Sequence, residues 1–247
     1  MSERGSFKID AENLHYRILN EELRGLIREG EKRIVLENVC GHRYIGNAVG
    51  EEVEIIIEGV PGNDLAAFMD GPRIIVNGNA QDGVGNTMNR GEVVIHGNAG
   101  DIVGYSMRGG RIFIRGDVGY RVGIHMKAYK QFFPVVIVGG GARDFLGEYM
   151  AGGLLVVLGM NSHTLVGDFI GTGMHGGTIL LRGEMDPRRL GKEVKIGKVT
   201  PEDRALLEKH LGDFCTCFGL DDNEIFKVPF TKISPYSHRP YGMTYAY

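Results

Sequence analysis

Two glycine-rich segments of the chain have the spacing of a nucleotide-binding loop. Gly171–Gly176 (GTGMHG) matches the dinucleotide fingerprint, in which backbone N–H groups at the start of a helix bind a pyrophosphate. A strand is expected at Thr178, however, where that chemistry needs a helix. Val135–Gly141 (VVIVGGG) could serve a dinucleotide-binding enzyme through Gly139–Gly141, but the helix after it, Ala142–Met150, would be short for a crossover unit of roughly 30 residues.

The remaining candidates for chemistry are isolated thiols, imidazoles and carboxylates. Cys215 and Cys217 have the form of half a metal site, but the chain has no second cysteine pair to complete tetrahedral zinc. The eight histidines are dispersed, and no Ser/His/Asp order or nucleophile elbow is present. Asp82, Asp101 and Asp117 occupy predicted corners, where short polar side chains bond the local backbone. We therefore predict no catalytic residue, no metal site and no bound cofactor.

The elements that would have to position such residues follow a repeat of 19 residues. Apolar runs end at glycines in a constant phase, and a small residue and a methionine follow at fixed offsets. The run-ending glycines are Gly59, Gly78, Gly97 and Gly116. The small residues are Ala66, Gly85, Gly104 and Gly123, and the methionines are Met69, Met88, Met107 and Met126. The register resumes after an insertion at 127–134, with Gly140, Gly147 and Met150, and later with Gly159, Gly167 and Met174.

This period predicts an all-β solenoid, a single-stranded right-handed parallel β-helix of about seven coils in which each coil buries its apolar face against the next. The methionines are expected to form an internal ladder, because methionine fills irregular gaps in a core. A hexapeptide-type acyltransferase would need a period of six residues, which the chain lacks.

The predicted organisation is one structural domain with three parts. Residues 1–32 hold a short helix, Glu21–Glu29, capped by Asn20; residues 33–191 form the β-helix; residues 192–247 hold a helix and an extended tail. The second helix starts after Thr200, with Pro201 at its first position, and stops at Gly219. It is expected to cover the open end of the solenoid. The tail, 225–247, is predicted to lie as a strap on the surface.

Several large apolar side chains are predicted to point outward from the solenoid. Strand alternation places Ile56, Ile75, Val94 and Phe113 in one outward column. The insertion adds three aromatic residues, Tyr129, Phe132 and Phe133. Such a surface is covered either by the chain's own ends or by another protein, so we predict a component of an assembly.

Composition restricts the classes of partner. The chain has 247 residues and a formal net charge of −3, and it contains no block of like charge typical of nucleic-acid or acidic-lipid binding. No apolar run reaches the roughly 18 residues that a membrane span needs, and the first ten residues do not resemble a signal peptide. A cytoplasmic protein with free thiols at Cys40, Cys215 and Cys217 is expected.

Two coils read G-x-x-G-x-x-x-G: Gly97, Gly100 and Gly104, followed by Gly116, Gly119 and Gly123. This pattern resembles the glycine-repeat (GXGXG) domain at the C-terminus of the large subunit of glutamate synthase. Segments outside the repeat resemble the free-standing form of that domain: 15–17 (HYR), 34–46, and 230–242 with its FTKI and RPYG sequences. The chain departs from the pattern at Gln81, Arg143 and Ala66, each of which replaces a glycine, and its Gly159 coil is one residue longer.

The resemblance implies a β-helix without catalytic residues of its own. In glutamate synthase, glutaminase chemistry belongs to an amidotransferase domain, and reductive amination of 2-oxoglutarate belongs to a barrel with flavin mononucleotide and an iron–sulfur cluster. A chain of 247 residues cannot hold that barrel besides the repeat. The resemblance therefore implies a scaffold subunit that binds both catalytic subunits and could self-associate when isolated. The same repeat occurs in a subunit of formylmethanofuran dehydrogenase, so a component of a related complex is the alternative.

Overall fold

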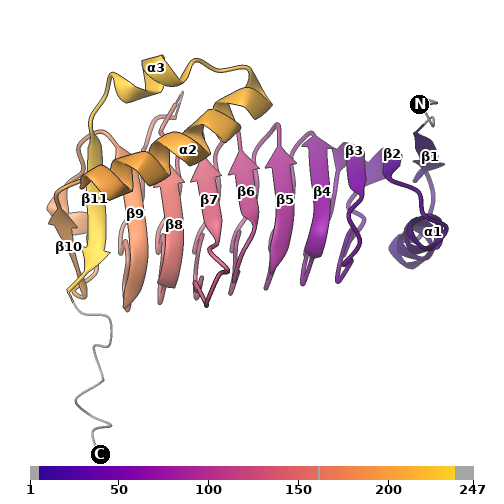
Figure 1. The fold of residues 1–247 in the computed structure, drawn as a ribbon, viewed down its shortest axis with the longest axis horizontal. Coiled ribbons are helices and arrows are strands. Elements are labelled where there is room, and N and C mark those ends of the chain that lie inside the picture. Colours follow the sequence, from indigo (N-terminus) through magenta and orange to yellow (C-terminus); the bar gives the residue numbers. More distant parts are fainter. Residues whose placement is uncertain (1–5, 161, 237–247) are drawn as a thin grey trace, which may run out of the picture.

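Parallel strands are stacked along the molecule in the order of the sequence. The computed structural model describes residues 6–160 and 162–236, and within them one sheet of 11 strands has the order β1 to β9, then β11 and β10 (Figure 1). The first nine strands pair in parallel. They are β1 (Phe7–Asp10), β2 (Arg33–Cys40), β3 (Glu54–Val60), β4 (Asp70–Asn77), β5 (Arg90–Ile95), β6 (Arg111–Ile114), β7 (Val135–Val138), β8 (Ala151–Val157) and β9 (Gly176–Arg182).

Adjacent strands pair in the register that the 19-residue period predicts. Ile55 pairs with Ile74, Ile74 with Val93, and Val93 with Ile112. Between the strands the chain makes bends and turns whose backbone N–H groups donate to the next coil, as from Phe68 to Asn86 at 2.8 Å and from Thr87 to Tyr105 at 2.8 Å. The prediction of a β-solenoid of about seven coils is confirmed.

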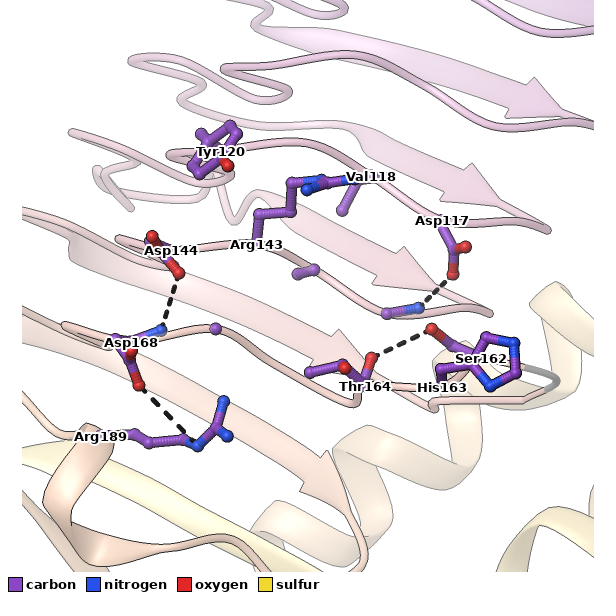
Figure 2. A pocket seen from close by; sticks show the side chains of 13 residues that line it. Asp117, Val118, Tyr120, Arg143, Asp144, Ser162, His163, Thr164, Asp168 and Arg189 are labelled. Atoms are coloured by element: carbon purple, nitrogen blue, oxygen red, sulfur yellow. Dashed lines mark hydrogen bonds and ion pairs between the residues drawn. The ribbon is translucent and has the colours of Figure 1, made fainter.

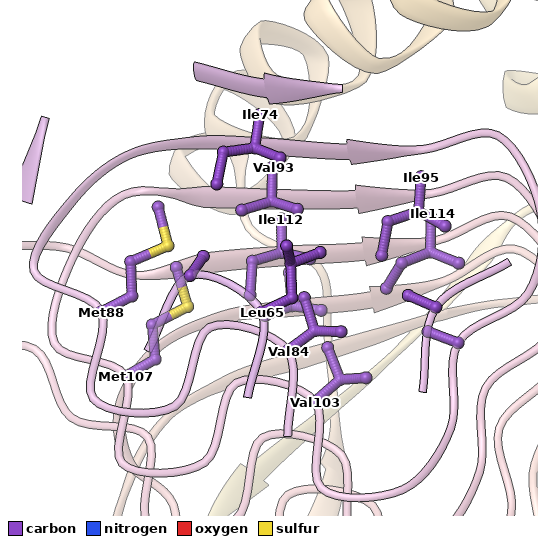
Figure 3. Packing of buried hydrophobic residues seen from close by; sticks show 14 of the residues in the cluster. Leu65, Ile74, Val84, Met88, Val93, Ile95, Val103, Met107, Ile112 and Ile114 are labelled. Atoms are coloured by element: carbon purple, nitrogen blue, oxygen red, sulfur yellow. The ribbon is translucent and has the colours of Figure 1, made fainter. Parts of the chain in front are cut away.

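The core lies inside the coils, and the methionines occupy one side of it. Six methionines have no exposed surface: Met69, Met88, Met107, Met126, Met150 and Met174. Figure 3 shows Met88 and Met107 on one side of the cluster, with Ile95 and Ile114 on the other. Four of them, Met69, Met88, Met126 and Met150, also explain a glycine in the coil that follows. A Cβ built on Gly110 would lie 2.6 Å from Met88 Cε, and one on Gly177 would lie 2.6 Å from Met150 Cε.

The middle glycines of the repeat are explained by polar side chains of the preceding coil. Asp82 Oδ1 accepts from the backbone N–H of Asp101 at 2.8 Å, and Asp101 Oδ1 accepts from Tyr120 at 2.8 Å. A Cβ on Gly100 would lie 2.1 Å from the Asp82 oxygen. The prediction that these aspartates bond their local backbone is therefore wrong, because their oxygens bond the next coil.

The same contacts account for two of the departures from the glycine pattern, Arg143 and Gln81. Arg143 is the equivalent of Gly119 in the next coil. The residue that would face it from the preceding coil is Tyr120, which is equivalent to Asp82 and Asp101 but has no carboxylate. Gln81 is the equivalent of Gly100 in the preceding coil. The residue that would face Gln81 is Asn63, the equivalent of Asp82, and among the described residues its side chain makes no hydrogen bond to the next coil. A side chain is tolerated at this position where no Asn or Asp oxygen of the preceding coil occupies the space.

Helix α1 (Tyr16–Arg28) begins earlier than predicted. Its N-cap is His15, whose side chain accepts from the Arg17 N–H, whereas Asn20 lies inside the helix and donates to the carbonyl oxygens of Tyr16 and Arg43. The buried face of α1 comprises Leu19, Leu23 and Ile27, which belong to the core cluster at its N-terminal end. Strand β1, which the sequence analysis did not predict, pairs with β2 and extends the sheet into the first 32 residues.

Helix α2 (Pro201–Phe218) has the predicted bounds. Thr200 and Asp203 form a capping box, and Gly219 ends the helix in the left-handed region with φ of 63°. The predicted place of the helix, over the open end of the solenoid, is wrong: α2 lies across the outer face of the sheet (Figure 1). The C-terminal end is instead extended by β11 (Phe230–Pro235), antiparallel to β9, and by β10 (Val194–Gly197), antiparallel to β11.

Two short helices complete the described chain, η1 (Pro187–Arg189) and α3 (Asp222–Phe226). Strand β10 shows that the sheet continues past residue 191, where the sequence analysis ended the β-helix. The three-part division at 32/33 and 191/192 stays a prediction. The predicted surface strap is a strand of the sheet at 230–235, and its last part, 237–247, lies outside the described residues.

Candidate partner interface

The outward apolar column runs through eight strands in register. Its members pair from one strand to the next: Val35, Ile56, Ile75, Val94, Phe113, Ile137, Val156 and Leu180. Val94 and Phe113 are only 1% and 0% exposed, because α2 covers them. They were predicted as partner contacts, and the structure places them in the chain's own interior. Ile75, from the same column, stays partly exposed.

Helix α2 packs on the outer face of the sheet, and about one apolar side chain in each of its turns contacts the strands. Its buried residues include the predicted face: Leu207, Leu211, Phe214 and Phe218. The ring of Phe214 meets Phe113 edge-on at 5.8 Å between centroids, and it meets Phe218 at 4.8 Å. Edge-to-face aromatic pairs contribute roughly 0.5–1.5 kcal/mol beyond burial. The helix and strands β5 to β9 therefore form a second core outside the solenoid.

A row of alternating charges runs beside the apolar column. Arg33, Glu54, Arg73, Glu92 and Arg111 lie on successive strands, and each neighbouring pair forms an ion pair at 2.7 to 3.3 Å. The row ends on α2, where Arg111 bonds the Asp213 carboxylate. The hydrogen bond that Arg73 donates to the Glu92 carboxylate is the main cause that raises the pKa of Arg73. The charges of this row pair with one another and with Asp213, so few of them remain to pair with charges of a partner protein.

The insertion at 127–134 forms a tight hairpin whose aromatic side chains face outward. Tyr129 and Phe132 exchange both backbone hydrogen bonds at 3.0 Å, and Lys130 between them adopts a left-handed conformation with φ of 54°. Tyr129 is 55% exposed and Phe133 41% exposed, whereas Phe132 is half-buried beside Gly109. The hairpin is thus held by its own backbone and leaves two large aromatic rings uncovered by the described chain.

One cavity of about 470 Å³ lies along the corners of the later coils (Figure 2). Its lining includes Asp117, Asp144 and Asp168, together with Arg143 and Arg189. The Asp117 and Asp144 carboxylates accept from backbone N–H groups of the next coil, at 2.7 and 2.9 Å, and Asp168 faces Arg189 at 3.8 Å. These groups are engaged with the solenoid itself, so we assign the cavity no chemical role.

The glycine motifs of the sequence are part of the coil packing. Gly171–Gly176 lies at a corner that leads directly into β9, and 142–150 forms a bend and turn where the dinucleotide alternative needed a helix. A Cβ on Gly139 would lie 2.3 Å from the Arg115 carbonyl oxygen, and one on Gly140 would lie 2.2 Å from Asp117 Oδ1. The neighbouring coil therefore occupies the space beside these glycines.

The cysteines and histidines do not converge in the described chain. Cys215 lies on the buried face of α2, and burial raises the pKa of its thiol to about 11. The Cys217 Sγ atom lies 4.0 Å from Nη2 of Arg73. His96 meets the ring of Phe218 edge-on. Within residues 6–160 and 162–236, no three His, Cys, Asp or Glu side chains are grouped so that they could hold a metal ion.

His210 makes the stability of α2 dependent on pH. It is 8% exposed and its Nδ1 has no hydrogen-bond partner in the described chain. Burial lowers the pKa of its imidazole, helped by Lys209 and Arg111 and opposed by Asp213. The unfolded chain therefore binds a proton more readily than the folded one. Stability is fully present above the ordinary histidine pKa of 6.5 and falls as pH drops through it, by at most about 1.4 kcal/mol per pH unit.

We expect His210→Gln to flatten this dependence between pH 7.5 and 5.5. The measurement is the free energy of unfolding in urea at both pH values, for the wild type and the variant. The pKa of His96 is also lowered by burial, so part of the slope should remain in the variant. An equal loss of unfolding free energy on acidification in the wild type and in His210→Gln would show that His210 does not cause the pH dependence.

In the described part of the chain, no helix is both long and apolar enough to cross a membrane. Comparison with known proteins gives two findings. A family model described as the GXGXG motif matches residues 30–235. The chain is also similar to the uncharacterized protein MJ1350 of Methanocaldococcus jannaschii, with 48% identity over 248 residues that cover 96% of this chain and 95% of that protein.

Proposed function

The chain belongs to the GXGXG family, the family of the glutamate synthase repeat domain, and from this membership we propose that it is a scaffold subunit of a glutamate synthase. In this role it binds the glutamine amidotransferase subunit and the synthase subunit that carries flavin mononucleotide and an iron–sulfur cluster. The chain itself contributes no catalytic residue or cofactor. It works in the cytoplasm, and it could self-associate when its partners are absent.

The structural observation that supports partner binding is the exposed hairpin at 129–133. Two aromatic rings, 55% and 41% exposed, stand on a backbone that is ordered by its own hydrogen bonds. Exposed aromatic clusters are costly in water and are enriched at protein interfaces. The polar side chains at the coil corners support the same proposal, since they bond the next coil and build a rigid support for a partner.

We expect Tyr129→Asp combined with Phe133→Asp, the two exposed rings of the hairpin, to disrupt the assembly while the chain stays folded. Burying one large apolar side chain contributes roughly 1.5–3 kcal/mol, so losing two such contacts should weaken partner binding by at least tenfold. The measurement is co-purification with the amidotransferase and synthase subunits, together with the rate of glutamate formation by the mixture. Both should fall, and far-UV circular dichroism should not change.

Phe169→Asp is the matched control, because Phe169 is 54% exposed and lies outside the hairpin. Unchanged assembly and turnover in the double variant would place the interface elsewhere. Loss of folding would show that the hairpin belongs to the chain's own core. Glutamate formation by the isolated chain would contradict the scaffold role directly.

A further inference from the structure

Helix α2 leaves the outer face of three strands uncovered. Val35 on β2, Ile56 on β3 and Ile75 on β4 belong to the column that continues into Val94 and Phe113. The first three are partly exposed, whereas the last two are buried under α2. We call Val35, Ile56 and Ile75 with their flanking charges the outer platform. In Figure 1 it is the face of β2, β3 and β4 beyond the C-terminal end of α2.

The backbone of the outer platform limits what can bind there. Strands β2, β3 and β4 are paired on both edges, so their backbone groups are engaged within the sheet. An added strand would find no edge, and only side chains are offered outward. The chain itself shows what fits this column: α2 places apolar residues over it at a helical pitch of about 5.4 Å, close to the strand spacing of about 4.8 Å.

The charges around the outer platform indicate which charge its occupant should carry. On one side, Arg33, Glu54 and Arg73 compensate one another. On the other side, Glu37 pairs with Lys8 at 2.5 Å, while Glu58 is exposed and accepts only the Asn77 amide at 2.7 Å, with no ion pair in the described chain. An occupant with a basic side chain toward Glu58 would supply the missing partner.

We propose that the outer platform binds an amphipathic helix of a partner subunit. The helix lays an apolar stripe of about two turns over Val35, Ile56 and Ile75, since the first and last of three adjacent strands lie about 10 Å apart. A lysine or arginine at its edge pairs with Glu58. The platform thereby continues the helix-on-sheet layer that α2 begins. The identity of the partner, a glutamate synthase subunit, rests on the proposed function.

The test compares three variants for binding to the purified amidotransferase and synthase subunits. Ile56→Lys combined with Ile75→Lys should weaken binding to one of them by at least tenfold, because it places charge in the apolar contact. Glu58→Lys should weaken it several-fold through repulsion of the basic residue. Ile196→Lys is the control: Ile196 is 44% exposed on β10, at the far end of the sheet, and its variant should bind as the wild type does.

The outcomes separate this inference from the proposed function. A wild-type chain that binds neither subunit overturns both. A wild-type chain that binds, with an Ile56→Lys/Ile75→Lys variant that binds equally well, overturns only the platform. A photo-crosslinking amino acid at position 75 decides the occupant even if the lysine pair prevents folding. Cross-links to a helical segment of the partner support the proposal, and cross-links to residues 237–247 or to a second copy of this chain overturn it.

Discussion

Gly100→Ala is expected to destabilise the protein by about 3 kcal/mol, although it adds only one methyl group. The new Cβ would lie 2.1 Å from Asp82 Oδ1 and 3.1 Å from Asp82 N. To relieve this clash, the Asp82 side chain must abandon its bond to the Asp101 N–H, which is 2.8 Å long. A lost hydrogen bond to a charged group costs roughly 1.5–3 kcal/mol, and overpacking adds about 1–3 kcal/mol. The measurement is the free energy of unfolding in urea.

Two controls isolate the contact. Gln81→Ala changes the equivalent position one coil earlier, where no such bond is made, and should stay within about 0.5 kcal/mol of the wild type. The double variant Asp82→Ala/Gly100→Ala should cost clearly less than the sum of the two single variants, because the oxygen that clashes with the methyl group is gone. Full additivity would show that the strain at Gly100 has another origin.

Phe214→Ala is expected to cost about 3–5 kcal/mol and to release α2 from the sheet. Phe214 is fully buried, and its ring contacts both Phe113 and Phe218. Truncation leaves a cavity between helix and sheet that neither rigid layer can close. Urea unfolding followed at 222 nm should show helix signal lost at lower denaturant than the sheet signal. Phe169→Ala, at a ring 54% exposed that stacks only on Phe145 among the described residues, is the control and should cost no more than about 1 kcal/mol. A loss below about 1 kcal/mol in Phe214→Ala would mean that α2 is held mainly by its other contacts.

The solenoid could be predicted because its 19-residue period is visible in the sequence. The spacing of Gly59, Gly78 and Gly97 sets the register of every strand between them, since each coil must stack on an equivalent coil. The methionine column follows from the same phase, and its burial agrees. The capping box at Thr200 and the stop at Gly219 were also predictable, because helix caps depend on residues only three or four positions apart.

The partner surface was predicted less completely. The outward column was found from strand alternation, but the division between its buried part, Val94 and Phe113, and its open part, Ile56 and Ile75, was not. The amphipathic pattern of α2 shows that one face is buried and does not show against what. The end of the solenoid and its outer face are both apolar, so local pattern could not choose between them.

By itself, the sequence determined the coil length, the inward and outward faces of each strand and the bounds of α2. These depend on periods and caps within one coil or one helix. Only the tertiary structure decided that Asp82 and Asp101 bond the next coil, that α2 lies on the sheet, and that Glu58 has no ion pair with any residue of the described chain. Those features join groups 19 or more residues apart, and their partners become neighbours only when the coils stack.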